Sequence, residues 1–186
     1  MVVSARKAAR VTRDEWLNKG LELFAVSGAD GLRVGRLAEA LDIAKSGFYC
    51  HFKDRDDLLD HILEYWVLHY TEVITKNVEL LNLPARDRLL LSMCKIFELN
   101  LSEFDSAVDI WSRSNTRVAR KRKLVMNTRL KFFRDAFEEL GFHGDDLEMR
   151  ARVCAAFQMG ERQTFGPEKK SSERFRKLRL KMLIGE

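Results

Sequence analysis

Helical periodicity runs through almost the whole sequence, and it is the feature that most restricts the folds open to this chain. Apolar side chains recur three and four residues apart, and no segment keeps the apolar–polar alternation that predicts a strand. The 186 residues include only two prolines and ten glycines, so few positions force a helix to stop. Because 46% of the residues are apolar, the chain can bury a core, and the sequence predicts an all-α protein.

The first helices are predicted from capping residues and from the turns between them. Thr12 and Glu15 have the capping-box spacing of a helix start, and Gly28 can end that helix in a left-handed conformation. A second, short helix follows, and segment 42–44 is long enough only for a tight turn before a third helix at about 45–52. Longer helices fill the rest of the chain. The apolar side of the first of them is predicted to be Leu58, Leu59, Ile62, Leu63, Trp66, Tyr70 and Val73.

Two short helices joined by a tight turn, after a longer capped helix, have the outline of a helix-turn-helix. An α-helix fits the major groove of B-form DNA, and residues at its N-terminal end reach the base edges. We therefore interpret the second short helix as the reading helix, with Phe48 and Phe52 facing the core. The side chains available to face DNA are Lys45, Ser46, Gly47, Tyr49, Cys50 and His51.

The charge of the chain is compatible with a nucleic-acid partner. The net charge is +5, and the first thirteen residues carry Arg6, Lys7, Arg10 and Arg13 without an acidic residue. Such a basic arm can neutralise phosphates, although a solvated terminus has the same composition.

The segment from Arg33 to Leu59 resembles the DNA-binding domain of the TetR family of bacterial repressors. The residues that carry the resemblance are Leu37, Ala38, Ile43, Lys45, Ser46, Gly47, Phe48, Tyr49, His51, Phe52, Leu58 and Leu59. The resemblance implies an N-terminal three-helix helix-turn-helix domain at residues 1–53. It also implies a C-terminal helical domain for ligand binding and dimerisation at residues 54–186.

The same resemblance implies roles for individual residues. Tyr49 and His51 fall where family members hold phosphates, and positions 45 to 47 and 50 fall where they approach the bases. Arg55 stands where a phosphate-contacting lysine is usual, and Arg33 replaces a helix-starting threonine in a place where it can add a phosphate contact. The predicted DNA-binding residues are therefore Arg33, Lys45, Ser46, Gly47, Tyr49, Cys50, His51 and Arg55.

Three further residues of this segment depart from the usual family pattern. Asp42 replaces a turn glycine, and we expect the turn to survive because aspartate tolerates left-handed geometry better than most residues. Ala44 replaces a capping serine, which weakens the expected start of the reading helix. Cys50 stands where a large aromatic or a basic residue is common, so no base preference follows from it.

The last two helices are expected, by the same resemblance, to pair with those of a second copy into a four-helix bundle. They are predicted at Asp145–Thr164 and Lys169–Leu183. Small side chains on the first of them allow close packing, either between copies or within one chain. They are Ala151, Ala155, Ala156 and Gly160.

Aromatic and methionine side chains of the middle helices are the candidates for a ligand pocket, although such residues more often belong to an ordinary core. The candidates are Trp66, Tyr70, Met93, Phe97, Trp111, Met126, Leu130 and Phe133. A lining of this kind suits a small apolar or planar ligand. The basic cluster at 117–123 is interpreted as a solvated helix start, with an anionic ligand or additional DNA contact as the alternative.

These features predict a homodimeric repressor that a small molecule releases from a double-stranded DNA operator. The alternative is a regulator of the same fold without a small ligand, controlled by a protein partner or by cysteine oxidation. An enzyme is not expected, because the adjacent Cys50 and His51 would point about 100° apart on a helix.

We expect no cofactor, metal or membrane partner. Cys50, Cys94 and Cys154 are odd in number, lie far apart and match no metal-ligand spacing, which is typical of a reduced intracellular protein. The N-terminal segment has no apolar stretch of the kind found in signal peptides, so a cytoplasmic location is expected.

Overall fold

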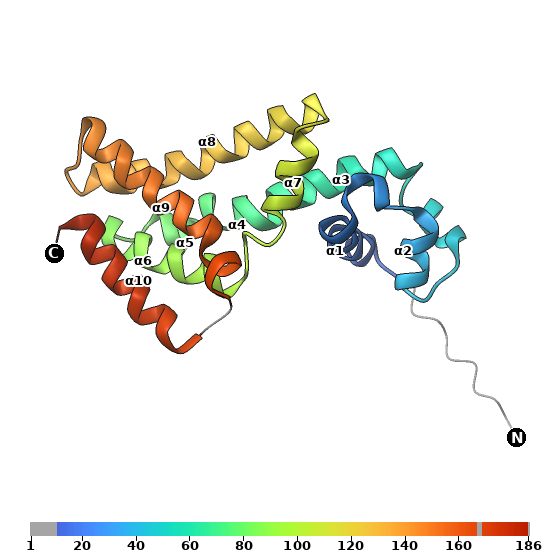
Figure 1. Cartoon of the computed structure of the whole chain (residues 1–186), viewed down its shortest axis with the longest axis horizontal. Helices are drawn as coiled ribbons and strands as arrows, with labels where there is room; N and C mark the ends of the chain where they lie inside the picture. The colour runs from blue at the N-terminus through green and yellow to red at the C-terminus, as the bar shows by residue number, and fades with distance from the viewer. Residues whose placement is uncertain (1–10, 167–168, 186) are drawn as a thin grey trace, which may run out of the picture. The chain divides into compact units, whose positions relative to one another are not determined.

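The computed structural model describes residues 11–166 and 169–185, and every regular element in those ranges is a helix (Figure 1). This confirms the predicted all-α fold. The chain forms two compact units, of which the first ends at Glu64 and the second begins at Tyr65. The division falls inside α3 (Arg55–Val67), whereas the sequence places the domain boundary just before that helix. Arg6, Lys7 and Arg10 of the predicted basic arm lie outside the described residues.

The first unit contains α1 (Arg13–Gly31), α2 (Val34–Ala40), the 3₁₀ helix η1 (Lys45–Cys50) and most of α3. The predicted capping box begins α1: the amide of Glu15 donates to Thr12 Oγ1 over 3.2 Å, and the amide of Thr12 donates to Glu15 Oε2 over 2.6 Å. Gly28 interrupts α1 with a φ of 66°, close to where the sequence predicts that the helix ends. The largest fully buried side chains of this unit include Trp16, Leu21, Phe24, Leu37, Phe48, Leu58 and Ile62.

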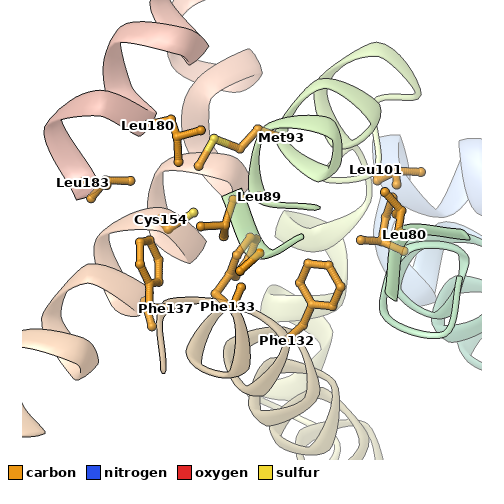
Figure 2. Close-up of a cluster of buried hydrophobic side chains, with 14 residues drawn as sticks. Leu80, Leu89, Met93, Leu101, Phe132, Phe133, Phe137, Cys154, Leu180 and Leu183 are labelled. Carbon is orange, nitrogen blue, oxygen red and sulfur yellow. The ribbon is translucent and has the colours of Figure 1, made fainter. Parts of the chain in front are cut away.

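The second unit is built on long helices around one apolar cluster, which includes Leu89, Phe133, Phe137, Cys154 and Leu180 (Figure 2). Its elements are the π-helical turn η2 (Leu68–Glu72), α4 (Val73–Thr75), α5 (Val78–Leu81), α6 (Ala85–Glu98), α7 (Asp105–Ser112), α8 (Thr116–Glu139), α9 (Gly144–Phe165) and α10 (Lys169–Ile184).

The apolar side predicted for the helix after residue 54 is correct as far as Trp66 and wrong at Val73. Val73 is 39% exposed, and Thr71 and Ile74 are buried instead. The reason is the π-helical turn η2, which adds a residue to one helical turn and rotates everything after it. A regular 3.6-residue pattern cannot predict that rotation.

Candidate DNA-binding surface and ligand-binding cavities

The turn between α2 and η1 has the geometry that the sequence predicts. Asp42 adopts a φ of 54°, in the left-handed region, and the amide of Ile43 donates to the carbonyl of Ala38 over 3.0 Å. Arg33 and Ala44 occupy the N-cap positions of α2 and η1, and neither side chain makes a capping hydrogen bond. The segment after Ala44 is a 3₁₀ helix and not an α-helix, in keeping with its weak start.

The inner side of η1 is fixed by aromatic packing. Phe48 is fully buried, and its ring meets Trp16 edge-on at a centroid distance of 5.6 Å and Phe52 at 5.2 Å. A Cβ at Gly47 would lie 3.6 Å from Ile43 Cδ1, so this glycine also faces the unit more than the solvent. This packing holds the outer side of the helix in one orientation.

The outer side of η1 carries four of the predicted DNA-binding residues. Lys45, Ser46, Tyr49 and Cys50 are all exposed, and the Tyr49 side chain is the most prominent apolar surface among them at 63%. A lysine, two small polar side chains and a phenol form a surface that can follow a DNA groove and hold phosphates.

His51 and Arg55, which are also predicted to contact DNA, make hydrogen bonds inside the first unit. His51 Nε2 lies 3.1 Å from the carbonyl oxygen of Val11. Arg55 donates from Nε to the carbonyl of Leu32 over 2.8 Å and from Nη2 to the carbonyl of Ala29. His51 therefore binds the backbone just before α1, and Arg55 binds the backbone at its C-terminal end. Their contacts with phosphate stay predictions.

Two cavities lie within the second unit and share part of their walls. The first, here called the inner cavity, has a volume of about 40 Å³ and is lined by residues from η2, α4, α6, α7, α8 and α9. The second, here called the outer groove, has a volume of about 510 Å³ and is lined by Trp66 and by residues from α7, α8 and α9. Asp105 and Met159 line both.

The predicted ligand-binding residues divide between these cavities and the core. Tyr70 and Phe133 line the inner cavity, and Trp66 and Met126 line the outer groove. The other four predicted residues line neither of the two: Met93, Phe97, Trp111 and Leu130. Met93 and Phe97 are buried core residues, which is the interpretation that the sequence alone already favoured for most members of the set.

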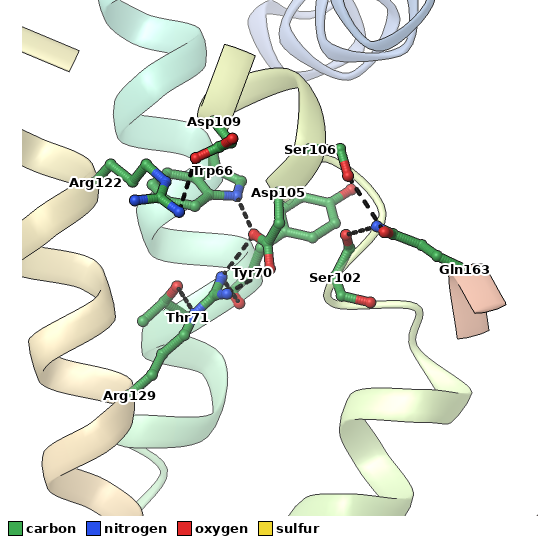
Figure 3. A network of polar contacts seen from close by, with 10 residues as sticks. All are labelled: Trp66, Tyr70, Thr71, Ser102, Asp105, Ser106, Asp109, Arg122, Arg129 and Gln163. Carbon is green, nitrogen blue, oxygen red and sulfur yellow. Dashed lines mark hydrogen bonds and ion pairs between the residues drawn. The ribbon is translucent and has the colours of Figure 1, made fainter. Parts of the chain in front are cut away.

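A buried polar network joins the walls of the two cavities (Figure 3). Arg129 donates to both oxygens of Asp105 over 2.5 and 3.1 Å, and Trp66 Nε1 donates to the same carboxylate over 3.0 Å. Arg129 also donates to Thr71 Oγ1 over 3.0 Å and to the carbonyl of Tyr70 over 3.1 Å. The guanidinium therefore binds the π-helical turn and α7 at the same time.

Asp105 and Arg129 are not among the residues that the sequence predicts for a ligand site. Arg129 falls three residues after Met126 on the apolar face predicted for α8, and a charged residue at such a position is the only sign of a buried partner. Asp105 gives no comparable sign, because its partner is 24 residues away along the chain.

The rim of the outer groove carries paired charges. Asp109 binds Arg113 over 2.9 Å and Arg122 over 2.8 Å, and the hydrogen bond from Arg113 is the main reason that the pKa of Asp109 is lowered. Arg122 belongs to the predicted basic cluster, so at least this member of it is held in an ion pair.

Exposed apolar side chains gather on the last two helices. On α9 they are Met149, Val153, Phe157 and Phe165, and on α10 they are Phe175, Leu178 and Met182. Of the four small residues noted on α9, Ala151 is fully buried in its own chain and Ala155 packs against the same core, whereas Ala156 is exposed.

In the part of the chain that the structure describes, no helix is long and apolar enough to cross a membrane. The same residues contain no group of histidine, cysteine, aspartate and glutamate side chains that could hold a metal ion.

Residues 17–62 match the family described as bacterial regulatory proteins, tetR family. The chain is 33% identical to the HTH-type transcriptional regulator AcrR of Shigella flexneri over 64 residues, which span 34% of this chain and 30% of that protein. The match therefore covers less than a third of the relative's length.

Two solved structures resemble the whole chain in fold. One is AibR in complex with isovaleryl coenzyme A and operator DNA, with a TM-score of 0.68, 18% identity, and coverage of 92% of this chain and 97% of that one. The other is FadR from Bacillus subtilis in complex with stearoyl-CoA, with a TM-score of 0.65, 17% identity, and coverage of 93% and 98%. The helix-turn-helix residues, their geometry and the family match agree, and residues 17–62 form a helix-turn-helix segment of the tetR family type.

Proposed function

We propose that this protein is a transcriptional repressor that binds an operator as a homodimer and leaves it when a small molecule binds the second unit. The observation that carries the proposal is the reading helix: η1 is seated on Phe48, and its outer side presents Lys45, Ser46, Tyr49 and Cys50 within the segment that matches the family.

Homodimerisation through α9 and α10 is part of the proposal. A single reading helix offers little contact area, so two half-sites are needed for useful affinity. The exposed apolar residues of α9 and α10 form the kind of surface that a second copy would cover. Leu178→Glu should then shift the chain towards monomer in sedimentation velocity. Leu99→Glu, at another exposed leucine outside these two helices, is the matched control and should not.

Ligand control is supported by the outer groove, whose volume of about 510 Å³ is in the range typical of small-molecule sites. Among proteins of similar fold, AibR and FadR have been crystallised with acyl-coenzyme A molecules. We propose that a ligand bound in this groove favours a form of the dimer in which the two η1 helices are no longer spaced to fit the two half-sites of the operator.

A second candidate keeps the fold and removes the ligand: a regulator controlled by a partner protein or by oxidation. The exposed thiol of Cys50 on the reading helix favours it. Burial raises the pKa of the Cys154 thiol to about 12, so Cys154 stays protonated and unreactive at neutral pH. Loss of operator binding on mild oxidation, abolished by Cys50→Ser, would support this candidate.

The deciding experiment uses full-length protein and DNA from the promoter beside its own gene. Fluorescence anisotropy at moderate salt should show tighter binding to this DNA than to a scrambled fragment, and the affinity should fall steeply as salt rises. Isovaleryl-CoA and stearoyl-CoA are then added as probes. Equal affinity for the two DNA fragments would contradict the proposal, and tight specific binding that no probe releases would favour the second candidate.

A further inference from the structure

Gln158 is a buried amide side chain of the second unit. Only 4% of the residue is exposed, and neither its Nε2 nor its Oε1 has a hydrogen-bond partner. A buried amide without partners costs free energy, and folded proteins rarely leave both of its ends unsatisfied. Something outside the protein chain is therefore needed to complete this group.

Gln158 lines the inner cavity, which identifies the space from which that partner would act. A cavity of about 40 Å³ accepts a group of only a few non-hydrogen atoms, since roughly 10–15 Å³ is needed for one water. Most of the remaining wall is apolar and includes Ile74, Phe132 and Met159. The cavity thus combines the Gln158 amide, which has no partner, with a largely apolar enclosure, and a few polar groups in an apolar lining are the usual composition of a small-molecule site.

The charges on the wall decide whether the bound group is ionic. Asp105 and Arg129 are the charged residues that line the inner cavity, and they neutralise each other through two hydrogen bonds. An ion placed there would lose its hydration without gaining a free counter-charge. A neutral group that both donates and accepts a hydrogen bond matches both ends of the Gln158 amide.

We propose that the inner cavity with Gln158 is a recognition site for a small neutral amide or hydroxyl group, either as a free molecule or as the buried end of a larger ligand. A larger ligand would continue into the outer groove past Met159, whose side chain lines both spaces and is flexible enough to move aside. The site selects a short, uncharged end and excludes a stearoyl chain, which the inner cavity is far too small to hold. The further claim that such a molecule is the effector of the regulator rests on the proposed function.

Three molecules of nearly equal size test the chemistry: acetamide is neutral and polar, acetate is charged, and isobutene is apolar. Each is titrated into isotopically labelled full-length protein, and the side-chain amide of Gln158 and the methyl group of Met159 are followed by NMR. Acetamide should shift both signals saturably and bind better than acetate and isobutene. Saturable shifts that favour acetate or isobutene, or no saturable shift at all, would overturn the proposal in favour of a cavity that holds water alone.

Gln158→Met removes the amide and keeps the length of the side chain. Acetamide should bind this variant roughly tenfold more weakly or worse, whereas isobutene should bind it at least as well as wild type. The melting temperature should rise, because the unsatisfied amide is gone. A fall in melting temperature with unchanged acetamide binding would mean that Gln158 has a structural role only.

Gln163→Met is the matched control on the same helix. Gln163 donates to the carbonyl of Ser102 over 3.0 Å and accepts from Ser106 Oγ over 3.2 Å, so losing its amide should not raise the melting temperature. Operator binding by the wild-type protein is measured in the same preparation. Its absence would contradict the proposed function and leave the acetamide result interpretable, whereas operator binding without an acetamide site would contradict this inference alone.

Discussion

The two compact units differ in how their functional residues are distributed along the chain. The proposed DNA-binding surface comes from one short segment, η1, together with the turn before it. The cavities of the second unit draw on residues from Trp66 in α3 to Gln163 in α9, spread over nearly a hundred positions. A contiguous surface can be predicted from a local pattern, whereas a dispersed one exists only after the helices have packed.

The first test removes the packing that holds the contiguous surface in place. Phe48→Ala should destabilise the protein by about 3–5 kcal/mol, because it empties the centre of a small aromatic cluster. Operator affinity should fall with it. The measurement is denaturant unfolding followed by operator titration.

The neighbouring residue is the control. Tyr49 is 63% exposed, so Tyr49→Ala should leave the unfolding midpoint nearly unchanged. If Phe48→Ala proves as mild as Tyr49→Ala, then η1 is not held by its inner side and the geometry of the reading surface needs another explanation.

The predictability of each unit follows from the range of its interactions. The capping box at Thr12 and the left-handed Asp42 are set by residues within a few positions, and both follow from the sequence. The π-helical turn η2 and the pair between Asp105 and Arg129 depend on tertiary packing. Sequence periodicity consequently misplaced Val73 and selected Met93 and Phe97, which are apolar and central but line neither cavity.

The second test concerns the dispersed site, where one buried ion pair connects several helices. Asp105→Asn leaves the Arg129 guanidinium without its counter-charge, with side-chain exposures of only 7% and 13% for the pair. The free energy of unfolding should fall by about 3–5 kcal/mol or slightly less, since asparagine keeps one acceptor. Thermal and denaturant unfolding measure the effect.

Two further variants test whether the effect comes from the buried charge. The double variant Asp105→Leu/Arg129→Met removes both charges and should recover much of the lost stability. Asp109→Asn, at an aspartate whose ion pairs are partly exposed, should cost about 1 kcal/mol or less. An equal loss for the two aspartates would mean that the buried network has no special role.

The third test returns to the contiguous surface and asks whether it binds DNA. Lys45→Ala should weaken operator binding by about 1 kcal/mol without changing the free energy of unfolding. The slope of log affinity against log salt concentration should fall by about 1, as expected for the loss of one phosphate contact. Lys53→Ala, an exposed lysine just beyond η1, is the control for loss of charge alone. The same loss in both variants would indicate general electrostatic attraction instead of a defined contact.

The smallest expected effect is a pH dependence in the second unit. Glu148 of α9 accepts hydrogen bonds from Arg134 of α8 and from Arg152, and these lower its pKa from 4.5 to about 2. Because the carboxylate is favoured in the folded state, its stabilising effect is complete above pH 4.5 and is lost as the pH falls towards 2. Glu148→Gln should remove only this part of the acid dependence, and added salt should reduce it, since the pair is partly exposed to solvent. An acid unfolding profile that Glu148→Gln leaves unchanged at low salt would show that the Glu148 ion pairs contribute nothing measurable to the packing of α8 against α9.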